Sequence, residues 1–385
     1  MNGKILNKFI KYNSLLPNSE YMYYPDEFIK MIHKDYLDIG IVQLKNPLYA
    51  TWDIVDECNL KCVFCSTNAK SINYDFISKK NVFRIVDFII NSGIIYVSIR
   101  GGEPSLCKEL GEVICRLTNS NVFVEIVTNG KNIDNKFFDE IINVPKHLIR
   151  IKISLDSYRQ QVNDELRGKY SYNNVINAMK ASKKNKYKFR IQMVVTKINY
   201  KDIFETYLLS EREGANSFGC VLLLPIGRGI KNNLIITINE TILDQLIEII
   251  NLKLDTKLEK IGFGTTAFKF YKELLKNIKI GDTESIINEH IKCNGAKTRI
   301  YIDSKGDLYP CELLKYDEFY MGNVKNGIDN AWNSSVAKNF CKVNRFTKVG
   351  CKDCLLKSCN TGCFAFGYEQ KLKIGKESPY CGLIY

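Results

Sequence analysis

Residues 57–65 read ECNLKCVFC, and the three cysteines in this stretch decide how the rest of the chain is interpreted. Their spacing, Cys-x3-Cys-x2-Cys, supplies thiolates at Cys58, Cys62 and Cys65. A [4Fe–4S] cluster with four Cys ligands is typical of electron transfer, whereas three ligands leave one iron able to bind a small molecule. A structural zinc ion takes four ligands, and no fourth Cys or His lies near this loop in the sequence. The spacing therefore favours a cluster with one open iron.

A second motif, RGGEP at residues 100–104, follows the apolar run 94–99, which predicts a buried strand. Two glycines at the end of a strand let the backbone approach a ligand, and Glu103 offers an acceptor for an ammonium group. Pro104 suits the first turn of a following helix. The motif therefore predicts a ligand-binding strand end downstream of the cysteine loop.

Together, these two motifs resemble those of the radical S-adenosylmethionine (SAM) enzymes. In that family the open iron chelates the methionine part of SAM, and an aromatic residue stands where Phe64 precedes the third cysteine. The resemblance implies that Gly101, Gly102 and Glu103 hold the SAM amino group. It also implies that a reduced cluster cleaves SAM to methionine and a 5′-deoxyadenosyl radical, which abstracts a hydrogen atom from the substrate.

Strand and helix patterns alternate through the first two thirds of the chain. The apolar, β-branched runs that predict strands are 50–55, 94–99, 122–127, 149–155, 189–195 and 217–224. Helical patterns such as 78–91 lie between them, so we expect an α/β fold with a parallel sheet. Six such units resemble the partial (β/α)6 TIM-type barrel of the radical SAM fold, in which chemistry takes place at the C-terminal ends of the strands.

Polar residues stand at two of these strand ends. Thr128 and Asn129 follow the third strand, Ser154 ends the fourth, and Arg167 comes later. Related maturases have a similar pattern, so the resemblance implies that these residues contact SAM, with the arginine on its carboxylate. The alternatives are a simple turn after the third strand and a surface ion pair for Arg167. The loop 224–229 resembles the end of the barrel in the same enzymes, although its glycines are equally typical of an ordinary loop.

Seven cysteines in the last quarter of the chain follow a second pattern: Cys293, Cys311, Cys351, Cys354, Cys359, Cys363 and Cys381. Their order resembles the SPASM extension of radical SAM maturases, with one residue fewer than usual between the fourth and fifth of them. The resemblance implies two auxiliary [4Fe–4S] clusters, one on Cys351, Cys354, Cys359 and Cys381, the other on Cys293, Cys311 and Cys363. The latter keeps an open iron or recruits Cys341 or His290. A pair of zinc sites is the alternative, because Cys-x2-Cys is also a zinc signature.

The expected organisation has four parts: an N-terminal segment of unknown role (1–45), the barrel (46–235), a helical bridge (236–290) and the SPASM domain (291–385). The β-branched run 298–303, with Ser304-Lys305-Gly306 after it, predicts a hairpin. Many peptide maturases carry a leader-binding module larger than 45 residues before the barrel. We therefore expect that a separate leader-binding protein, the SPASM surface or the N-terminal segment captures the substrate.

The amino-acid composition constrains the partners and the localisation of the protein less strongly than the motifs constrain its chemistry. The net charge is +13, but the chain has no Arg-rich stripe with interleaved aromatics, so nucleic acid is not the expected partner. It has no apolar run of about 18 residues and no signal peptide, so neither a membrane nor secretion is expected. Its 14 cysteines are then better explained by metal clusters in the cytoplasm than by disulfides.

SPASM enzymes mostly act on peptides, so the resemblance implies maturation of a ribosomally made peptide (RiPP) by a thioether, C–C or ether crosslink. A flavodoxin or ferredoxin would supply the electrons. The alternative enzyme is an anaerobic sulfatase maturase, in which an Asp follows the second SPASM cysteine. Here Glu312 stands at that position, and it is interpreted as a catalytic base or as a structural acid. Alternatives of other classes are an iron–sulfur electron carrier, a zinc-stabilised peptide-binding protein and an RNA-modifying radical SAM enzyme.

Overall fold

The computed structural model describes residues 43–69, 78–224, 226–236, 239–254, 261–263 and 294–341, together with Ala365 and Tyr368. In these residues one sheet has the strand order β10-β9-β8-β1-β2-β3-β4-β5-β6-β7. The strands are β1 (Tyr49–Val55), β2 (Tyr96–Gly101), β3 (Phe123–Thr128), β4 (Ile149–Ser154), β5 (Phe189–Val195), β6 (Ser217–Leu222), β7 (Ile261–Phe263), β8 (Arg299–Ile302), β9 (Asp307–Tyr309) and β10 (Gly322–Asn323). From β8 to β7 all neighbours pair in parallel, whereas β9 pairs antiparallel with both β8 and β10.

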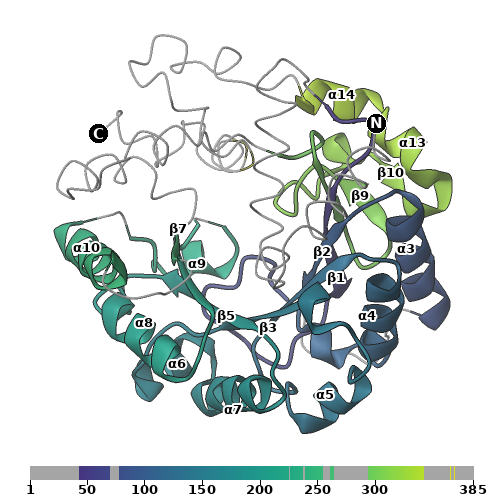
Figure 1. Ribbon diagram of the computed structural model, residues 1–385. Helices are drawn as coiled ribbons and strands as arrows, with labels where there is room; N and C mark the ends of the chain where they lie inside the picture. Colours follow the sequence, from purple (N-terminus) through teal and green to yellow (C-terminus); the bar gives the residue numbers. More distant parts are fainter. Residues whose placement is uncertain are drawn as a thin grey trace.

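Helices connect the parallel strands β1 to β6. They are α3 (Lys79–Asn91), α4 (Leu110–Asn119), α5 (Asn135–Glu140), α6 (Gln160–Arg167), α7 (Ser171–Lys184) and α8 (Ile203–Arg212), with α9 (Arg228–Lys231) and α10 (Glu240–Leu254) after β6. Figure 1 shows α3 to α8 in an arc around the outer side of the sheet. The predicted α/β fold with six strand–helix units is confirmed, and each of the six predicted strands lies within two residues of its observed start and end.

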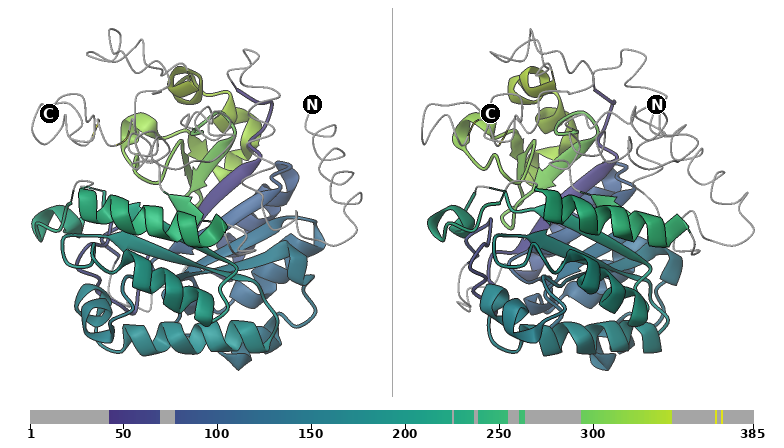
Figure 2. Two further views of the ribbon diagram at one scale, coloured as in Figure 1. Left: turned by 60° about the vertical axis from the view of Figure 1, so that its left-hand side comes forward. Right: turned by 90° about the vertical axis from the view of Figure 1, so that its left-hand side faces the viewer.

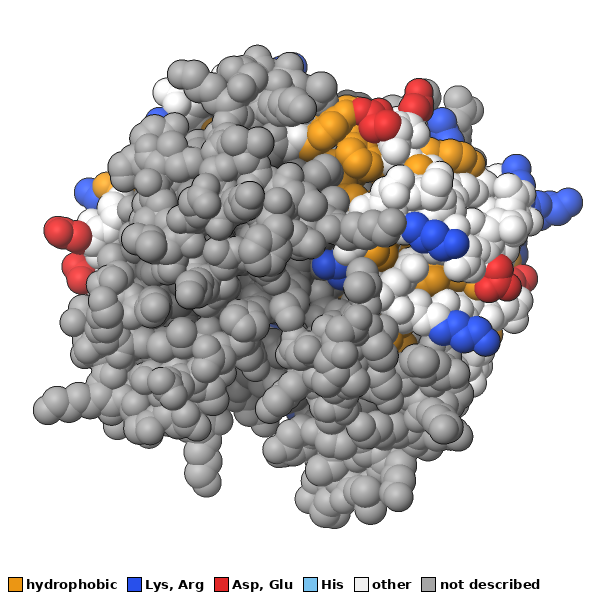
Figure 3. Space-filling model, turned by 90° about the horizontal axis from the view of Figure 1, so that it is seen from above, with side chains coloured by type: hydrophobic (Ala, Val, Ile, Leu, Met, Phe, Trp, Pro, Cys, Tyr) orange, Lys and Arg blue, Asp and Glu red, His pale blue; other side chains and the backbone are white. Residues whose placement is uncertain are grey.

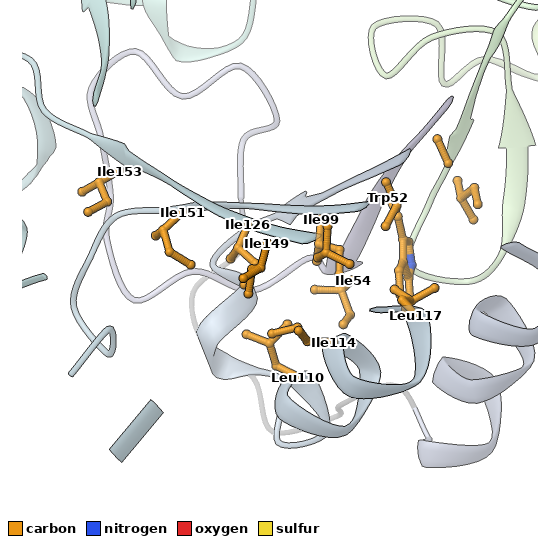
Figure 4. Close-up of a cluster of buried hydrophobic side chains, with 14 of the residues drawn as sticks. Trp52, Ile54, Ile99, Leu110, Ile114, Leu117, Ile126, Ile149, Ile151 and Ile153 are labelled. Atoms are coloured by element: carbon orange, nitrogen blue, oxygen red, sulfur yellow. The ribbon is translucent and has the colours of Figure 1, made fainter. Parts of the chain in front are cut away.

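Alternation along the strands separates an apolar outer face from a polar inner face. Isoleucines from β2, β3 and β4 point toward helix α4, whose own apolar residues share one face: Leu110, Ile114 and Leu117 (Figure 4). All of them are buried. Because successive side chains of a strand point to opposite faces, the residues between these isoleucines line the inner face of the sheet. Burial of the outer apolar layer fixes the register of the strands, and the inner face of the sheet is available for polar functional residues.

The segment between the barrel and the SPASM domain is not purely helical. Helix α10 is present as expected, but β7 extends the sheet beside β6 with the pairs Phe218–Ile261 and Cys220–Phe263. A strand of this length is too short for its periodicity to be recognised in the sequence.

The expected hairpin after residue 298 is confirmed, and it belongs to the same sheet as the barrel. Strand β8 pairs in parallel with β1, from Tyr49–Arg299 to Trp52–Ile302. Figure 2 shows this C-terminal segment in light green beside the purple strand β1, at the opposite end of the molecule from the teal helices. The sheet is therefore continuous across the expected boundary between the barrel and the C-terminal segment.

The described part of the chain has no helix that is long and apolar enough to span a bilayer. On the side of the molecule seen in Figure 3, the coloured residues place basic and acidic side chains near one another. The coloured part of that side therefore lacks the extended patch of one charge sign that would indicate a nucleic-acid surface.

Candidate functional site

The cysteine loop leaves the C-terminal end of β1, and two later segments of the chain hold its backbone. Val63 N–H donates a hydrogen bond to Leu166 O (2.9 Å). Arg228 makes the other two contacts: its backbone N–H donates to Cys65 O (3.0 Å), and its Nε donates to Cys62 O (2.8 Å). Arg228, in a loop that the sequence indicated only as the end of the barrel, thus holds the backbone of the cysteine loop in place.

Two hydrogen-bond donors face the sulfur of Cys58. Leu60 N–H lies 3.4 Å from its Sγ, and Asn129 Nδ2 lies 3.9 Å from it. Burial raises the pKa of the Cys58 thiol to about 11. A thiolate at this position therefore needs a bound cation together with these donors to be stabilised.

The other two thiols differ in their surroundings. Burial raises the pKa of Cys62, whereas at Cys65 hydrogen bonds from Thr67 and Ala69 outweigh burial and lower the pKa. Within the described ranges, no three His, Cys, Asp or Glu side chains are grouped as ligands of one metal ion. Three cysteines of a [4Fe–4S] cube bind three different irons, so they need not be grouped in that way. The donor set at 58–65 fits such a cluster.

Gly101 and Gly102 lie directly against the backbone that enters this loop. A Cβ on Gly102 would be 1.9 Å from Glu57 O, and one on Gly101, whose φ is +130°, would be 2.1 Å from Val55 O. Gly102 N–H donates to Val55 O and Glu103 N–H to Glu57 O, both at 2.8 Å. We expected these glycines to admit a ligand. The structure adds a second reason for them, because they also admit the chain's own backbone at 55–57, and their contact with SAM stays a prediction.

The carboxylate of Glu103 is buried, with 1 % of the residue exposed. Its Oε1 accepts from Thr128 Oγ1 (2.7 Å) and Ser105 N–H (3.1 Å), and its Oε2 accepts from Asn129 N–H (2.8 Å). Burial raises the pKa of Glu103 despite these bonds. A carboxylate accepts about four hydrogen bonds, so Oε2 retains room for one further donor. That capacity suits an N–H of the SAM ammonium group. Pro104 begins a 3₁₀ turn, as expected of the first helical residue.

Asn129 joins the two motifs. Its backbone N–H binds Glu103, while its side-chain Nδ2 donates to Asn59 Oδ1 at 2.7 Å within the cysteine loop. Residues 128 and 129 therefore do more than turn the chain, because they connect the strand end of β3 to both Glu103 and the cysteines.

Arg167 ends helix α6 and forms an ion pair with Asp156, with 2.5 Å between Nε and Oδ2. The side chains are 8 % and 0 % exposed, so a surface ion pair is the wrong interpretation. The guanidinium lies 5.4 Å from the centre of the Phe64 ring. Burial lowers the pKa of Arg167, but Asp156 and Cys62 outweigh it and raise the pKa. SAM contacts by Arg167 and by the half-buried Ser154 at the end of β4 remain predictions.

A sequence profile of the Radical SAM superfamily matches residues 52–209, and one of the SPASM iron–sulfur cluster-binding domain matches residues 293–355. This chain is a radical SAM enzyme with a SPASM domain. The first match spans the cysteine loop, the RGGEP motif and the strand ends described above.

Two curated proteins and two solved structures of a third protein illustrate the relationship. Mycofactocin maturase MftC of Mycobacterium tuberculosis is 26% identical over 343 residues, which are 88% of this chain and 83% of that protein. AdoMet-dependent heme synthase of Methanosarcina barkeri is 22% identical over 352 residues, 89% and 98% of the two chains. Streptococcus suis SuiB bound to S-adenosylmethionine superposes with a TM-score of 0.69 at 20% identity over 92% and 81% of the chains. SuiB has also been solved with its precursor peptide SuiA (TM-score 0.68, 21% identity, 90% and 79% of the chains).

In the SPASM domain of this radical SAM enzyme, Glu312 lies between two arginines. Arg100 Nη1 is 3.0 Å from its Oε1, and Arg299 Nη2 binds its Oε2. Cys311 Sγ lies 3.2 Å from the same Oε2. Burial raises the pKa of Glu312, but the two arginines outweigh it and hold the pKa at about 2. A carboxylate with so low a pKa accepts a proton poorly, so the structure favours the structural acid over the base, and the base stays a prediction.

We expect Glu312→Gln to lower the free energy of unfolding while leaving the ratio of modified product to 5′-deoxyadenosine unchanged. The variant leaves two half-buried guanidinium groups without their carboxylate, which costs roughly 2–5 kcal/mol. Anaerobic denaturant unfolding measures the first quantity, and single-turnover analysis measures the second. Glu312→Asp, which keeps the charge, is the control. A lost product with normal 5′-deoxyadenosine and normal stability would instead support the catalytic base.

The structure reports on only part of the expected auxiliary site. Cys311 lies at the end of the β8–β9 hairpin, and Cys341 is buried in α14 (Ser335–Cys341), where its Sγ donates to Ala296 O at 2.9 Å. The other expected ligands lie outside the described residues: Cys293, Cys351, Cys354, Cys359, Cys363, Cys381 and the candidate His290. Both auxiliary clusters therefore remain predictions.

Sequence reasoning missed two residues of the site. Asp156 was not among the predicted site residues, yet it neutralises Arg167 beside the cysteine loop. Arg228 was quoted only as part of a loop, yet it hydrogen-bonds two carbonyls of the cysteine loop. Arg228 and Cys62 are 166 positions apart, so no local pattern indicated their contact.

Proposed function

We propose that this enzyme is a peptide maturase that generates a 5′-deoxyadenosyl radical from SAM and uses it to abstract a hydrogen atom from one residue of a peptide. The expected outcome is a crosslink, such as a thioether, C–C or ether bond, in a ribosomally made peptide. The observation that carries the proposal is the connection, through Asn129, of the cysteine loop to the buried Glu103 at one end of the sheet.

Two comparisons support a peptide substrate. MftC is named a maturase and matches this chain over nearly its whole length. SuiB, whose fold this chain shares, was solved with a precursor peptide. The heme synthase is the contrasting relative, so the experiment has to distinguish a peptide from a porphyrin substrate.

Each residue of the site has a separate role in this proposal. Cys58, Cys62 and Cys65 would hold a [4Fe–4S] cluster, which when bound supplies the electron that cleaves SAM. Glu103 accepts a hydrogen bond from the SAM ammonium group through the remaining capacity of Oε2. Asp156 holds Arg167 beside Phe64, where the guanidinium can meet the SAM carboxylate. Two auxiliary [4Fe–4S] clusters in the SPASM domain, and a flavodoxin or ferredoxin as electron donor, complete the proposal.

Anaerobic reconstitution with iron and sulfide, followed by reduction with dithionite in the presence of SAM, tests the proposal. We expect iron–sulfur absorbance, formation of 5′-deoxyadenosine, and a mass loss of two hydrogens in a peptide encoded beside the gene. Cys58→Ala, Cys62→Ala and Cys65→Ala should each abolish 5′-deoxyadenosine, because each removes one of only three ligands.

Other outcomes would contradict the proposal in distinguishable ways. Stoichiometric zinc without iron would exclude radical chemistry. Normal 5′-deoxyadenosine with consumption of an iron porphyrin, and no change in any peptide, would assign a different substrate. Conversion of a Ser or Cys residue to formylglycine would identify a sulfatase maturase.

A further inference from the structure

The net charge of the chain is concentrated in residues 166–201. This stretch contains ten Lys and Arg residues and no Asp or Glu, so it carries +10 of the total of +13. The rest of the chain carries only +3. Like charges repel one another, and a block of one sign is typical of a surface that meets a partner of the opposite charge.

The stability of helix α7 accounts for only some of these cations. Lys183 and Lys184 lie in its last turn, where positive charges complement the helix dipole. Lys180 lies four residues before Lys184, a spacing at which like charges destabilise a helix. All three side chains are exposed. Lys180 is therefore not explained by its own helix.

A pocket of about 430 Å³ lies between helix α7 and the loop that follows β3. Lys180 and Lys184 line it from α7, together with Asn174 and Asn177 at helical spacing on the same face. Lys131 lines it from the loop. Figure 1 shows α7 beside α5, the helix that this loop enters. We call this site the lysine pocket.

The lysine pocket has an excess of positive charge. Its lining contains three lysines and one carboxylate, that of Asp134. Asp134 Oδ1 accepts from Phe137 N–H at 3.1 Å and so caps helix α5. Within the described part of the chain, none of the three lysines forms an ion pair. The pocket therefore suits a partner that brings carboxylates of its own.

The lysine pocket also lies next to the cysteine loop. Gly130 lines the pocket, and the residue before it, Asn129, places its Nδ2 3.9 Å from Cys58 Sγ. Lys131 N–H donates to Asn129 Oδ1 at 3.0 Å, which holds this turn in shape. Electron transfer slows steeply with the distance between donor and acceptor. A redox protein bound at this pocket would thus have a short path to a cluster on Cys58.

We propose that the lysine pocket docks an acidic electron-transfer protein, which reduces the cluster held by Cys58, Cys62 and Cys65. The reduced donor loses one electron, and the cluster gains it. Carboxylates of the donor supply the negative charge that Lys131, Lys180 and Lys184 lack. The proposal rests on the proposed function, because it assumes a [4Fe–4S] cluster that cleaves SAM.

The test compares protein and chemical reductants on one variant of the reconstituted holoenzyme, which combines Lys131→Gln, Lys180→Gln and Lys184→Gln. The protein probes are a reduced acidic flavodoxin and a reduced acidic ferredoxin, each below saturation and at low ionic strength. We expect the rate of 5′-deoxyadenosine formation to fall at least about tenfold with one or both proteins, because steering by opposite charges is lost. With dithionite, which needs no docking surface, the rate should stay the same.

A matched control removes the same charge elsewhere. Lys305, Lys325 and Lys338 are exposed lysines of the C-terminal segment, and the variant with all three changed to Gln should keep the rate with every reductant. A second measurement needs no turnover. Carbodiimide joins lysines to carboxylates in contact, so treating the holoenzyme with the oxidised donor should cross-link it at Lys131, Lys180 or Lys184, as mapped by mass spectrometry. High salt should suppress these cross-links.

Equal rates for the variant and the unaltered enzyme with both protein donors would overturn the proposal. So would an equal loss with dithionite, which would show a damaged site, or cross-links confined to other lysines. Protection of the three lysines by RNA but by neither donor would assign the surface to nucleic acid instead. A holoenzyme that cross-links to the donor at this pocket, yet forms no 5′-deoxyadenosine with dithionite, would contradict the proposed function and leave the docking surface standing.

Discussion

Gly102→Ala should lower the rate of 5′-deoxyadenosine formation by about a hundredfold or more, the scale of loss that a misplacement of about 1 Å causes. The new Cβ would lie 1.9 Å from Glu57 O and 2.8 Å from Asp56 O. Both atoms belong to the backbone directly before Cys58, so relieving the clash must move the cysteine loop relative to Glu103. The rate is measured by chromatography under single-turnover conditions, and iron content is measured on the same samples.

Gly327→Ala is the matched control for this variant. Gly327 has a positive φ of +75°, but a Cβ there meets nothing within 4 Å. The control therefore costs about 1 kcal/mol of backbone strain without a clash, and activity should persist. An active Gly102→Ala enzyme with full iron content would refute the close approach on which the site depends.

Asp156→Ala should lower the free energy of unfolding by about 3–5 kcal/mol, because it leaves the buried Arg167 without its counter-charge. Asp156 Oδ1 also accepts from Val194 N–H at 2.8 Å, so the same change strands a backbone donor of β5. Anaerobic denaturant unfolding provides the measurement. The loss is a large fraction of the total stability of a typical domain.

Two comparisons sharpen this second prediction. Glu112→Gln breaks the ion pair with Lys79, in which the Glu112 and Lys79 side chains are 49 % and 63 % exposed, so it should lower the free energy of unfolding far less than Asp156→Ala does. The double variant Asp156→Leu with Arg167→Met should recover much of the lost stability, because it removes both buried charges. If Asp156→Ala proves as mild as Glu112→Gln, the pair is not buried in solution and the account of Arg167 fails.

The features that the sequence predicted well are local ones. The six strands and helices such as α3 follow from hydrophobic periodicity, and the cysteine loop and RGGEP motif follow from spacing within a few residues. Their meeting at one end of the sheet also follows, because the C-terminal ends of parallel strands lie together. Glu103, Thr128 and Asn129 were each predicted at a strand end to contact SAM, and for this reason they are found in contact with one another, while their contacts with SAM stay predictions.

The features that the sequence did not predict depend on contacts between distant residues or on very short elements. Glu312 and Arg100 are 212 positions apart, and no periodicity indicates that they pair. Strand β7 has too few residues to show alternation. The packing of Gly101 and Gly102 against the backbone at 55–57 was not predicted, because this contact is known only once β1 and β2 are placed side by side.

Because β8 pairs with β1, the C-terminal hairpin covers the edge strand of the barrel sheet. Without it, the main-chain groups of β1 from Tyr49 to Trp52 would face water as an open strand edge, which invites aggregation. Trp332 adds a second connection between the C-terminal segment and the residues before β1, because its Nε1 donates a hydrogen bond to Leu44 O at 2.7 Å. Exchanging C-terminal modules between maturases therefore requires more than matching cysteines, since the incoming module must also bring a strand that can continue this ladder.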